Sequence, residues 1–472
     1  MRVLIASSEI QPLAKTGGLA DVCAGLASEL SRLGAEVRLI LPAYESALDV
    51  VREPGMPTDL GELLGVPARL ILARVPGNGL AIWLVDCPAL FRRPGTPYQD
   101  AQGADWPDNA LRFGVFSHAI ARVALGAATL DWRADIVHCH DWHTGLAPYL
   151  IAGRAERPHS VFTIHNAAFQ GNFPLSVAPD LGLPREVLTP ETMEFYGRLS
   201  FLKAGIRYAE RLTTVSPTYA RELLTPEFGC GLEGLIATRA SDFIGILNGI
   251  DTRTWNPATD PLIAERYSSQ DLAGKAACKA ELQRENGLAQ DARAPVVSFA
   301  SRLTGQKMAD TTLERLPRLL AQYPRLQFAL LGSGERAIEE GFAELARRHP
   351  ARVAAHIGYC EAREHRLHAG ADILLHGSRF EPCGLAQMYA MRYGAVPIVR
   401  GVGGLADTVA DEDTGFVFRE ASPDALAEGI GRAVQAYERG EDWLPLQRRA
   451  MNADFGWRRP ARAYLDLYRS GA

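Results

Sequence analysis

The pentapeptide Gly-Gly-Leu-Ala-Asp occurs twice in the chain, at residues 17–21 and at residues 403–407. A pair of glycines at the start of a helix lets the backbone approach a ligand closely, and the N–H groups of the first turn favour an anion. Lys15 stands just before the first copy and adds the cation that a diphosphate would need. Two ordinary helix starts are the alternative for either copy alone. The pair predicts a phosphate-binding turn in each half of the chain.

Two further stretches carry charges that suit a diphosphate and a sugar. SRLTGQK at 301–307 follows an apolar run and supplies Arg302 and Lys307, two cations at the end of an expected strand. Such cations can stabilise the negative charge that grows on a diphosphate leaving group. SRFEPCGLAQ at 378–387 carries the carboxylate of Glu381, then a turn and a helix start. Surface charges in a loop, or a charge at a helix N-terminus, are the alternatives.

The stretch HCHDWH at 138–143 has the composition of a metal site, with three histidines, one cysteine and one aspartate. Successive residues of a strand point to opposite faces, so His138 and His140 share a side that Cys139 does not. This geometry disfavours a metal cluster. We expect neither a metal ion nor a cofactor.

One stretch matches the glycine pattern of nicotinamide-binding domains. LLGSGERA at 330–337 contains G-x-G-x-x-A, and a lone match of this kind is weak evidence. No acidic residue stands at the end of the next expected strand, about 20 residues later, where such domains carry one. The sequence therefore disfavours a nicotinamide-dependent enzyme.

The composition is that of a globular protein with more than one domain. A chain of 472 residues suggests about two to three domains, and its hydrophobic content of 47% and charged content of 22% are ordinary. A net charge of −5 lacks the basic excess of nucleic-acid-binding proteins, so we expect no nucleic-acid partner. No apolar run approaches the roughly 18–20 residues of a membrane span. The start MRVLIASSEI predicts a strand instead of a signal peptide. Seven cysteines without a CxxC pair favour the reducing cytoplasm.

Short apolar runs alternate with longer segments of helical periodicity, which is typical of βαβ units and an α/β fold. Runs that are apolar along their whole length suit the buried strands of a parallel sheet. One series of runs ends near residue 250, and a second begins with PVVSFAS. The expected strands are 3–6, 37–41, 70–73, 82–85, 136–139, 161–164, 212–215, 296–300, 328–331, 353–357, 373–375 and 396–399. The expected helices include 19–33, 108–127, 310–323, 385–393 and a closing helix with Trp457, Ala461, Tyr464, Leu465 and Tyr468 on one face.

KTGGLADV near the N-terminus resembles the signature of bacterial glycogen synthases and plant starch synthases, which are retaining glucosyltransferases of the GT-B type. Further family blocks follow in the family's order over most of the chain: VHCHDWHTGL, TIHNAAFQG, TVSPTYARELLTPEFGCGLEGLI, ILNGIDTRTWNP, SRLTGQK, SRFEPCGLAQMYAMRYGAVPIVR and GGLADTV. The resemblance implies an α/β fold of two Rossmann-like domains with parallel sheets that face each other across a deep cleft. We expect an acceptor domain at 1–250, a nucleotide-sugar domain at 251–455 and a C-terminal helix at 456–472 that returns to the first domain.

The resemblance also implies a role for each residue that matches a family position. The expected catalytic residues are His165, Arg302, Lys307 and Glu381. The expected donor-binding residues are Lys15, Gly18, Asp21, Asn166, Asn248, Tyr359, Cys383, Gly384 and Leu385. The expected acceptor-binding residues are Glu9, Tyr98, Asp141 and Trp142.

The implied activity is transfer of glucose from ADP-glucose to the non-reducing 4-hydroxyl of an α-1,4-glucan, with the anomeric configuration retained. No carboxylate is obviously placed for a double displacement, so a same-face mechanism assisted by the leaving phosphate is the simpler hypothesis. Tyr389 stands where related transferases of the sucrose-synthase type place a second glutamate. Three positions depart from the usual family residues: Met308 replaces glycine, and Ala386 and Val402 replace threonine. A UDP-glucose-dependent transferase and a non-catalytic glucan-binding scaffold are the alternatives.

Overall fold

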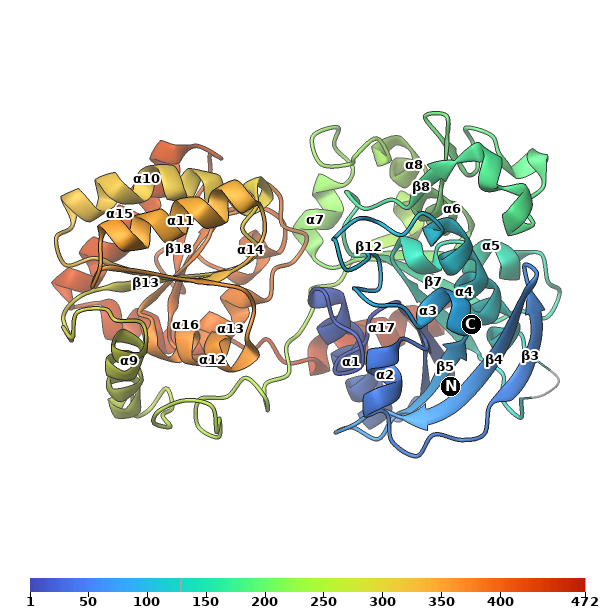
Figure 1. The fold of residues 1–472 in the computed structure, drawn as a ribbon, viewed down its shortest axis with the longest axis horizontal. Coiled ribbons are helices and arrows are strands. Elements are labelled where there is room, and N and C mark those ends of the chain that lie inside the picture. The colour runs from blue at the N-terminus through green and yellow to red at the C-terminus, as the bar shows by residue number, and fades with distance from the viewer. Residues whose placement is uncertain (128–129, 472) are drawn as a thin grey trace. The chain divides into compact units, whose positions relative to one another are not determined.

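The computed structural model describes residues 1–127 and 130–471, and the chain divides into two compact units (Figure 1). Unit 1 comprises Met1–Gly249 together with Trp457–Ala472, and unit 2 comprises Ile250–Gly456. Ala472, the last residue of the expected closing helix, lies outside the described residues. Each unit is built on a sheet of mainly parallel strands covered by helices, which confirms the expected α/β class.

Unit 1 contains a nine-stranded sheet with the order β12-β11-β7-β6-β1-β2-β5-β4-β3. The central strands are apolar and buried on both faces, because helices cover both sides of the sheet. The strands are β1 (Arg2–Ala6), β2 (Glu36–Pro42), β3 (Thr58–Leu63), β4 (Val66–Arg74), β5 (Ala81–Asp86), β6 (Ile136–His140), β7 (His159–Ile164), β11 (Arg211–Thr214) and β12 (Phe243–Gly245). A separate three-stranded sheet contains β8 (Asn172–Pro174), β9 (Glu194–Phe195) and β10 (Arg198–Ser200).

The edge of the larger sheet departs from the expected parallel arrangement. Strand β4, which contains the predicted run 70–73, is antiparallel to both β3 and β5. Leu64 and Gly65 join β3 to β4 with positive φ angles of 52° and 75°, as a tight hairpin turn requires. Buried and exposed residues alternate along much of β4, because one face of the sheet meets solvent at this strand, which lies next to the edge strand β3. A short apolar run by itself does not distinguish a strand with parallel neighbours from a strand with antiparallel neighbours.

Helices cover both faces of this sheet. Phe162 and Thr163 are neighbours on β7 and therefore point to opposite faces. The ring of Phe162 lies against Gly205 of α6, whereas Thr163 and Tyr468 of α17 both bond to His138. The helices of unit 1 are α1 (Gly18–Arg32), α2 (Glu45–Val50), α3 (Pro88–Phe91), α4 (Asn109–Ala124), α5 (Ala147–Ala152), α6 (Phe201–Tyr208), α7 (Pro217–Glu222), α8 (Glu233–Thr238) and α17 (Arg458–Gly471).

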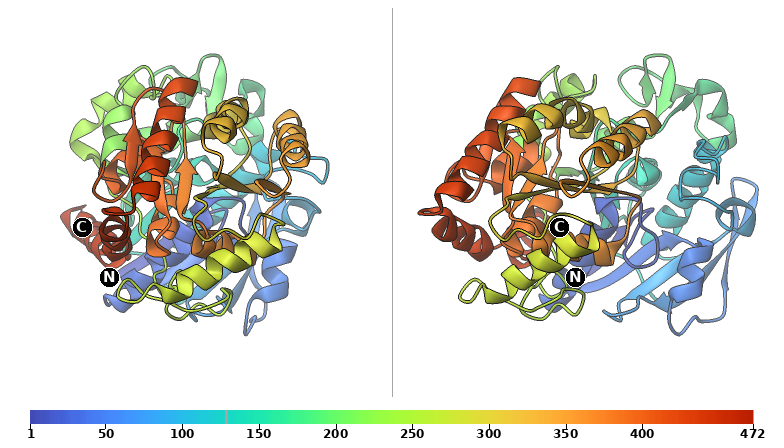
Figure 2. Two further views of the ribbon diagram at one scale, coloured as in Figure 1. Left: turned by 90° about the vertical axis from the view of Figure 1, so that its left-hand side faces the viewer. Right: turned by 60° about the vertical axis from the view of Figure 1, so that its left-hand side comes forward.

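Unit 2 contains a six-stranded parallel sheet with the order β15-β14-β13-β16-β17-β18. Helices α10, α11 and α15 lie over one face of this sheet, and α9, α12 and α13 lie over the other (Figures 1 and 2). Val297 and Phe299 of β13 belong to the hydrophobic core under the first group, whereas Val296 and Ala300 belong to the core under the second. The strands are β13 (Val296–Ala300), β14 (Gln327–Gly332), β15 (Val353–Ile357), β16 (Ile373–His376), β17 (Val396–Arg400) and β18 (Phe416–Phe418). The helices are α9 (Ala273–Glu285), α10 (Ala309–Gln322), α11 (Arg336–Arg348), α12 (Glu361–Gly370), α13 (Ala386–Arg392), α14 (Gly403–Thr408), α15 (Pro423–Arg439) and α16 (Trp443–Asn452).

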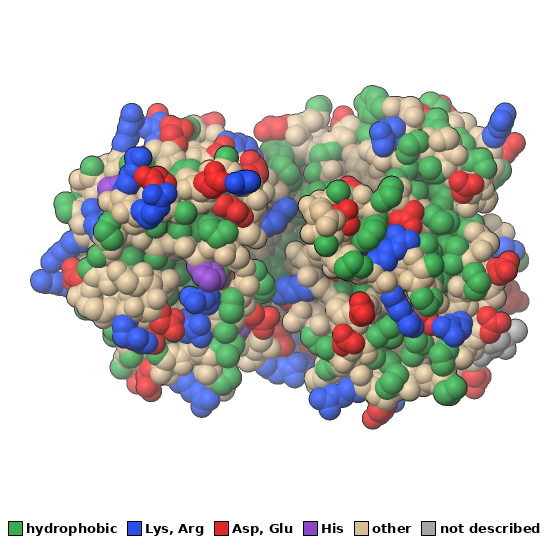
Figure 3. Space-filling view, in the orientation of Figure 1, with side chains coloured by type: hydrophobic (Ala, Val, Ile, Leu, Met, Phe, Trp, Pro, Cys, Tyr) green, Lys and Arg blue, Asp and Glu red, His purple; other side chains and the backbone are tan. Residues whose placement is uncertain are grey.

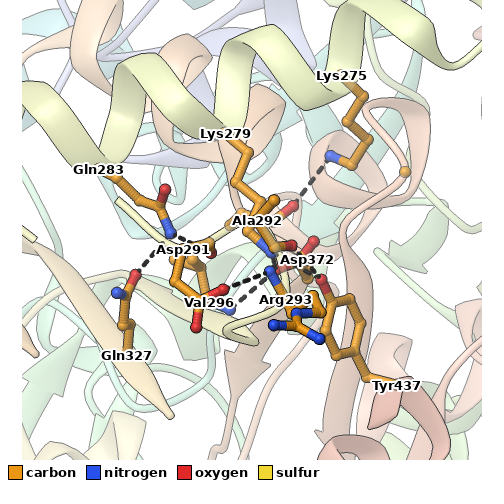
Figure 4. A network of polar contacts seen from close by, with 12 residues as sticks. Lys275, Lys279, Gln283, Asp291, Ala292, Arg293, Val296, Gln327, Asp372 and Tyr437 are labelled. Atoms are coloured by element: carbon orange, nitrogen blue, oxygen red, sulfur yellow. Dashed lines mark hydrogen bonds and ion pairs between the residues drawn. The ribbon is translucent and has the colours of Figure 1, made fainter. Parts of the chain in front are cut away.

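Helix α9 packs through buried polar side chains spaced four residues apart (Figure 4). Lys275 Nζ donates to carbonyls at the ends of α12 and α13, including those of Ala371 at 2.9 Å and Tyr393 at 2.7 Å. A cation is favourable there because helix C-termini leave carbonyls unpaired. Lys279 pairs with the buried carboxylate of Asp372 at 2.7 Å. These bonds explain how a polar sequence forms part of the interior.

The surface carries charges of both signs. On the face drawn in Figure 3, Lys and Arg side chains are interspersed with Asp and Glu side chains. Within residues 1–127 and 130–471, no helix has the length and apolar character needed to cross a membrane.

The contact between α1 and α17 generates a stability prediction. A Cβ atom at Gly25 of α1 would lie 2.0 Å from Nε1 of Trp457, which is buried just before α17. We expect Gly25→Ala to destabilise unit 1 by about 1–3 kcal/mol, because the indole has to move out of a packed interface. The Tm values of the wild type and of Gly25→Ala, from thermal unfolding, measure this difference in stability. Gly234→Ala in α8 is the matched control, because among the described residues no atom beyond its chain neighbours and its own helix backbone lies within 4 Å of the added Cβ. An equal or higher Tm for Gly25→Ala would contradict the packing.

Candidate active site

In unit 2 the central strands β13 and β16 are adjacent, and their neighbours β14 and β17 lie on opposite sides. Ligands of open α/β sheets bind at such points, beyond the carboxyl ends of the strands. Lys307 follows β13 and Glu381 follows β16, so the topology brings these two predicted residues to the same place. Lys307 Nζ contacts Glu381 Oε2 directly.

The carboxylate of Glu381 is held through one of its two oxygens. Oε2 also lies 2.9 Å from Ser378 Oγ and 3.1 Å from His376 Nε2. Burial by itself would raise the pKa of Glu381, but Lys307 and His376 hold that pKa well below its ordinary value. The group is therefore ionised at neutral pH. Oε1 has no partner among the described residues and is not enclosed, so it can accept a hydrogen bond from a ligand hydroxyl.

The loop that carries Lys307 is fastened to the loop that carries Glu381. Gln306 Nε2 donates to the carbonyl of Phe380 at 3.2 Å and Gln306 Oε1 accepts from Arg302 at 3.0 Å. Arg302 is exposed, and within residues 1–127 and 130–471 its guanidinium bonds only to Gln306, which leaves further donors for a ligand. Arg302 and Lys307 thus belong to one loop, and Gln306 fixes this loop through hydrogen bonds.

Met308 occupies a backbone position that favours glycine. Its φ of 52° and ψ of 30° are left-handed, and it forms the N-cap of α10. The usual glycine of the resembled family suits this conformation. The side chain of Met308 is fully buried in the core of unit 2, against Gly377. The substitution therefore adds apolar packing at the expense of backbone strain.

The second Gly-Gly pair does not present both N–H groups to a ligand. The N–H of Gly404 donates to the carbonyls of Glu381 at 3.2 Å and Pro382 at 3.3 Å. A Cβ atom at Gly404 would lie 2.3 Å from the carbonyl oxygen of Cys383. The expectation of a free phosphate-binding turn is therefore wrong for this N–H group. The glycine is needed because two loops pack backbone against backbone.

The other predicted donor residues of unit 2 lie on neighbouring loops. Gly384 has a φ of 71° and precedes Leu385, the N-cap of α13. Ala386 begins that helix, where the resembled family usually has threonine. Tyr359 follows β15, and 59% of its surface is exposed.

In unit 1 the corresponding point lies between the adjacent strands β1 and β6. Glu9 follows β1 and Asp141 follows β6, while His165 and Asn166 follow β7. Asn248 follows β12 and is buried, with an Oδ1 atom that has no partner among the described residues. These residues belong to a different unit from Lys307 and Glu381.

Glu9 holds the first Gly-Gly loop. Its buried carboxylate accepts from the N–H of Thr16 at 2.5 Å, from Thr16 Oγ1 at 2.6 Å and from the N–H of Gly17 at 3.1 Å. Tyr98 also donates its hydroxyl to this carboxylate. Lys15 lies 2.9 Å from Asp21 Oδ1. Both Glu9 oxygens are thus occupied within the protein, whereas the sequence predicted a contact with the acceptor.

Gly18 is the first residue of α1, and Gly17 is its N-cap. Glu9 therefore fixes the backbone at the point where this helix begins.

Asp141 holds the backbone of the turn after β7 that contains His165 and Asn166, called the His165 turn below. Its Oδ1 accepts from the N–H of His165 at 2.8 Å, and its own φ of 58° is unusual for a residue other than glycine. Burial raises the pKa of Asp141 from 3.8 to about 7, although the N–H groups of His165 and Asn166 lower it in part. Trp142 packs against Gly171, where a Cβ atom would lie 2.3 Å from the indole.

Sequence analysis missed several residues that contact the predicted ones. His376 and Ser378 bond to Glu381, and His140 Nδ1 lies 2.8 Å from His165 Nε2. The alternation rule placed His138 and His140 on one side of β6, and their rings do lie 4.1 Å apart. The contact with His165 depends on the pairing of β6 with β7, which the sequence does not state.

Two family profiles match the chain. The profile described as "Starch synthase catalytic domain" matches residues 2–238, and the profile described as "Glycosyl transferases group 1" matches residues 281–445. Both matches agree with a transferase built from two domains.

Two relatives that match this chain over at least 90% of their own length are both named glycogen synthase. A glycogen synthase from Burkholderia thailandensis is 57% identical over 98% of this chain and 90% of the relative. A glycogen synthase from Paramagnetospirillum magneticum is 48% identical over 100% of this chain and 97% of the relative.

Solved structures match the whole fold. The catalytic domain of starch synthase IV from Arabidopsis thaliana, bound to ADP and acarbose, superposes with a TM-score of 0.89 at 33% identity, over 100% of this chain and 99% of that one. A sucrose-phosphate synthase from Thermosynechococcus elongatus has a TM-score of 0.62 at 18% identity, over 99% of this chain and 98% of that one, and shows the fold alone.

The raised pKa of Asp141 predicts a pH-dependent stability. Between about pH 4 and pH 7 the folded state keeps a proton on Asp141 that the unfolded state has released, so rising pH lowers the free energy of unfolding. Asp141→Asn removes this titration and keeps an oxygen for His165. We expect the Tm of the variant minus that of the wild type to increase from pH 4 to pH 7 and then to level off. Asp180→Asn, at an exposed position, controls for the lost charge; a difference independent of pH would contradict the assignment.

The N-terminus of α14 predicts a stabilising substitution. Val402 is the N-cap, with an extended backbone (φ −132°, ψ 151°) and no side-chain hydrogen bond. In Val402→Thr the hydroxyl can share the N–H of Leu405, which already donates to the carbonyl of Val402 at 3.0 Å, and such a cap is worth up to about 1 kcal/mol. Thermal unfolding should show a higher Tm than that of the wild type. Val402→Ser tests the same cap without the methyl group of threonine. Lower Tm values in both variants would show that apolar burial at this site outweighs capping.

Proposed function

The chain belongs to the family of the starch and glycogen synthases and is a glycosyltransferase of the GT-B type, and we propose that it transfers glucose from ADP-glucose to the non-reducing 4-hydroxyl of an α-1,4-glucan. The observation that carries the proposal is the pair of Lys307 and Glu381 in unit 2, at the carboxyl ends of the adjacent strands β13 and β16. It combines a cation for a diphosphate with an open carboxylate oxygen for a sugar hydroxyl.

On the donor side, Arg302 and Lys307 neutralise the diphosphate as its negative charge grows. Glu381 Oε1 accepts from a hydroxyl of the donor glucose, because Oε2 is already held by three donors. Residues Cys383 to Leu385 lie at the start of α13, where the helix dipole favours phosphate oxygens.

On the side of unit 1, Lys15 supplies a further cation at the start of α1. His165 and Asn166 contact the donor glucose, and Trp142 with Tyr98 lines the acceptor side. Asp141 and Glu9 act by holding the loops that carry these groups.

The reaction retains the anomeric configuration. The bond between the anomeric carbon and the diphosphate oxygen breaks as ADP leaves, and the acceptor 4-oxygen forms its bond on the same face. The departing phosphate takes the proton of the acceptor hydroxyl. No carboxylate nucleophile is required, so a trapped glucosyl-enzyme would contradict this mechanism.

We place the enzyme in the cytoplasm. All seven cysteines of the chain are free, which agrees with a reducing compartment. Its substrates are a nucleotide sugar and a glucan.

The test is glucose transfer to glycogen from ADP-glucose and from UDP-glucose, measured side by side. We expect ADP-glucose to be preferred and Lys15→Ala to lower kcat about a hundred-fold, as the loss of a charge-stabilising group does in other enzymes. Arg32→Ala at the other end of α1 is the matched control for a lost cation, and it should keep wild-type activity.

Each other outcome selects an alternative. Preference for UDP-glucose would keep the mechanism and change the donor. Glycogen binding without transfer from either donor would support the scaffold hypothesis and reject the enzyme.

A further inference from the structure

The rings of three histidines in unit 1, His138, His140 and His165, lie next to one another in a row. The ring centroids of His138 and His140 are 4.1 Å apart, and those of His140 and His165 are 5.1 Å apart. His138 is held at both nitrogens, with Tyr468 of α17 2.7 Å from Nδ1 and Thr163 2.6 Å from Nε2. His138 is therefore a fixed surface on which the ring of His140 packs.

The tautomers of His140 and His165 are coupled. His140 Nδ1 and His165 Nε2 are 2.8 Å apart. Burial lowers the pKa of His165 to about 3 and lowers the pKa of His140 well below its ordinary value, so both rings are neutral at neutral pH. Each neutral ring carries one N–H and one lone pair. One ring must donate and the other must accept, so the choice in one ring sets the proton position in the other.

The surroundings of His140 decide which ring donates. Its Nε2 atom is buried and has no hydrogen-bond partner among the described residues. A proton on Nε2 would leave a buried N–H without an acceptor, and such orphaned donors are rarer in proteins than unpaired acceptors. A proton on Nδ1 avoids this and donates to His165. His165 Nε2 then accepts, and the His165 proton resides on Nδ1.

We propose that His140 is a positioning residue that fixes His165 in the Nδ1–H tautomer and thereby presents a hydrogen-bond donor to an oxygen of the donor sugar. His165 Nδ1 has no partner among residues 1–127 and 130–471 and is not enclosed by them. Asp141 holds the backbone of the same residue at 2.8 Å, so both the main chain and the ring of His165 are oriented. The inference rests on the proposed function, because it requires a sugar beside this ring.

Two substitutions separate hydrogen bonding from packing. His140→Asn places an amide nitrogen near the former Nδ1 and can donate to His165, whereas His140→Leu fills similar space and cannot donate. We expect His140→Leu to lower kcat with ADP-glucose about ten-fold, the effect of losing one hydrogen bond, and to change KM little. His140→Asn should restore kcat to within about three-fold of the wild type.

A control variant accounts for loss of a buried ring elsewhere. His118→Leu on α4 removes a partly buried imidazole that bonds to the backbone of Leu181, and it should keep the wild-type kcat. Thermal unfolding of each variant identifies losses that come from stability. Equal kcat in His140→Leu and the wild type, or equal losses in His140→Leu and His140→Asn, would overturn the inference.

A second measurement reads the tautomer without turnover. With nitrogen-15 in the histidine rings, two-bond proton–nitrogen correlations distinguish Nδ1–H from Nε2–H, and His165→Gln identifies the His165 signals. We expect His165 to be in the Nδ1–H form in the wild type. An Nε2–H signal for His165 would reject the inference even in an active enzyme. Absence of glucose transfer by a wild type with the Nδ1–H signal would instead reject the proposed function.

Discussion

A carboxylate that leaves water needs hydrogen-bond donors, and this requirement shapes the loops at the carboxyl ends of the central strands. Glu9, Asp141 and Glu381 each follow a central strand, and each is buried. Backbone N–H groups hold Glu9 and Asp141, whereas a lysine, a histidine and a serine hold Glu381. The positions of Lys15, His165 and Lys307 follow from these contacts.

Groups whose hydrogen bonds are all made within the protein support the site, whereas groups with an unbonded atom are available to a substrate. Both oxygens of Glu9 are bonded within the protein, so Glu9 serves the loop that carries Lys15. Among the described residues, Glu381 Oε1 and His165 Nδ1 have no hydrogen-bond partner. Each of these two atoms is therefore available for a hydrogen bond with a substrate.

The three departures from the usual family residues affect folding in different ways. Met308 tolerates a left-handed backbone because its side chain fills the core of unit 2. Val402 leaves α14 without a side-chain cap but is buried itself. Ala386 begins α13 and brings no hydroxyl to the loop beside Glu381. None of the three removes a group that holds Glu381 or Lys307.

The α/β class follows from the amino-acid sequence, because apolar runs and helical periodicity are local patterns that record which faces are buried. Each predicted strand run forms a strand, with Val215 of the run 212–215 lying just past the end of β11. The antiparallel pairing of 70–73 was missed because an apolar run does not encode its partner. Motif spacing and family resemblance named the candidate residues, and their assigned roles remain predictions.

The tertiary structure alone decided which of these residues meet. The contact of His140 with His165, the occupation of both Glu9 oxygens and the packing of Gly404 on Cys383 join positions far apart in the chain. Strand order and loop packing set these contacts, and neither can be derived from local periodicity.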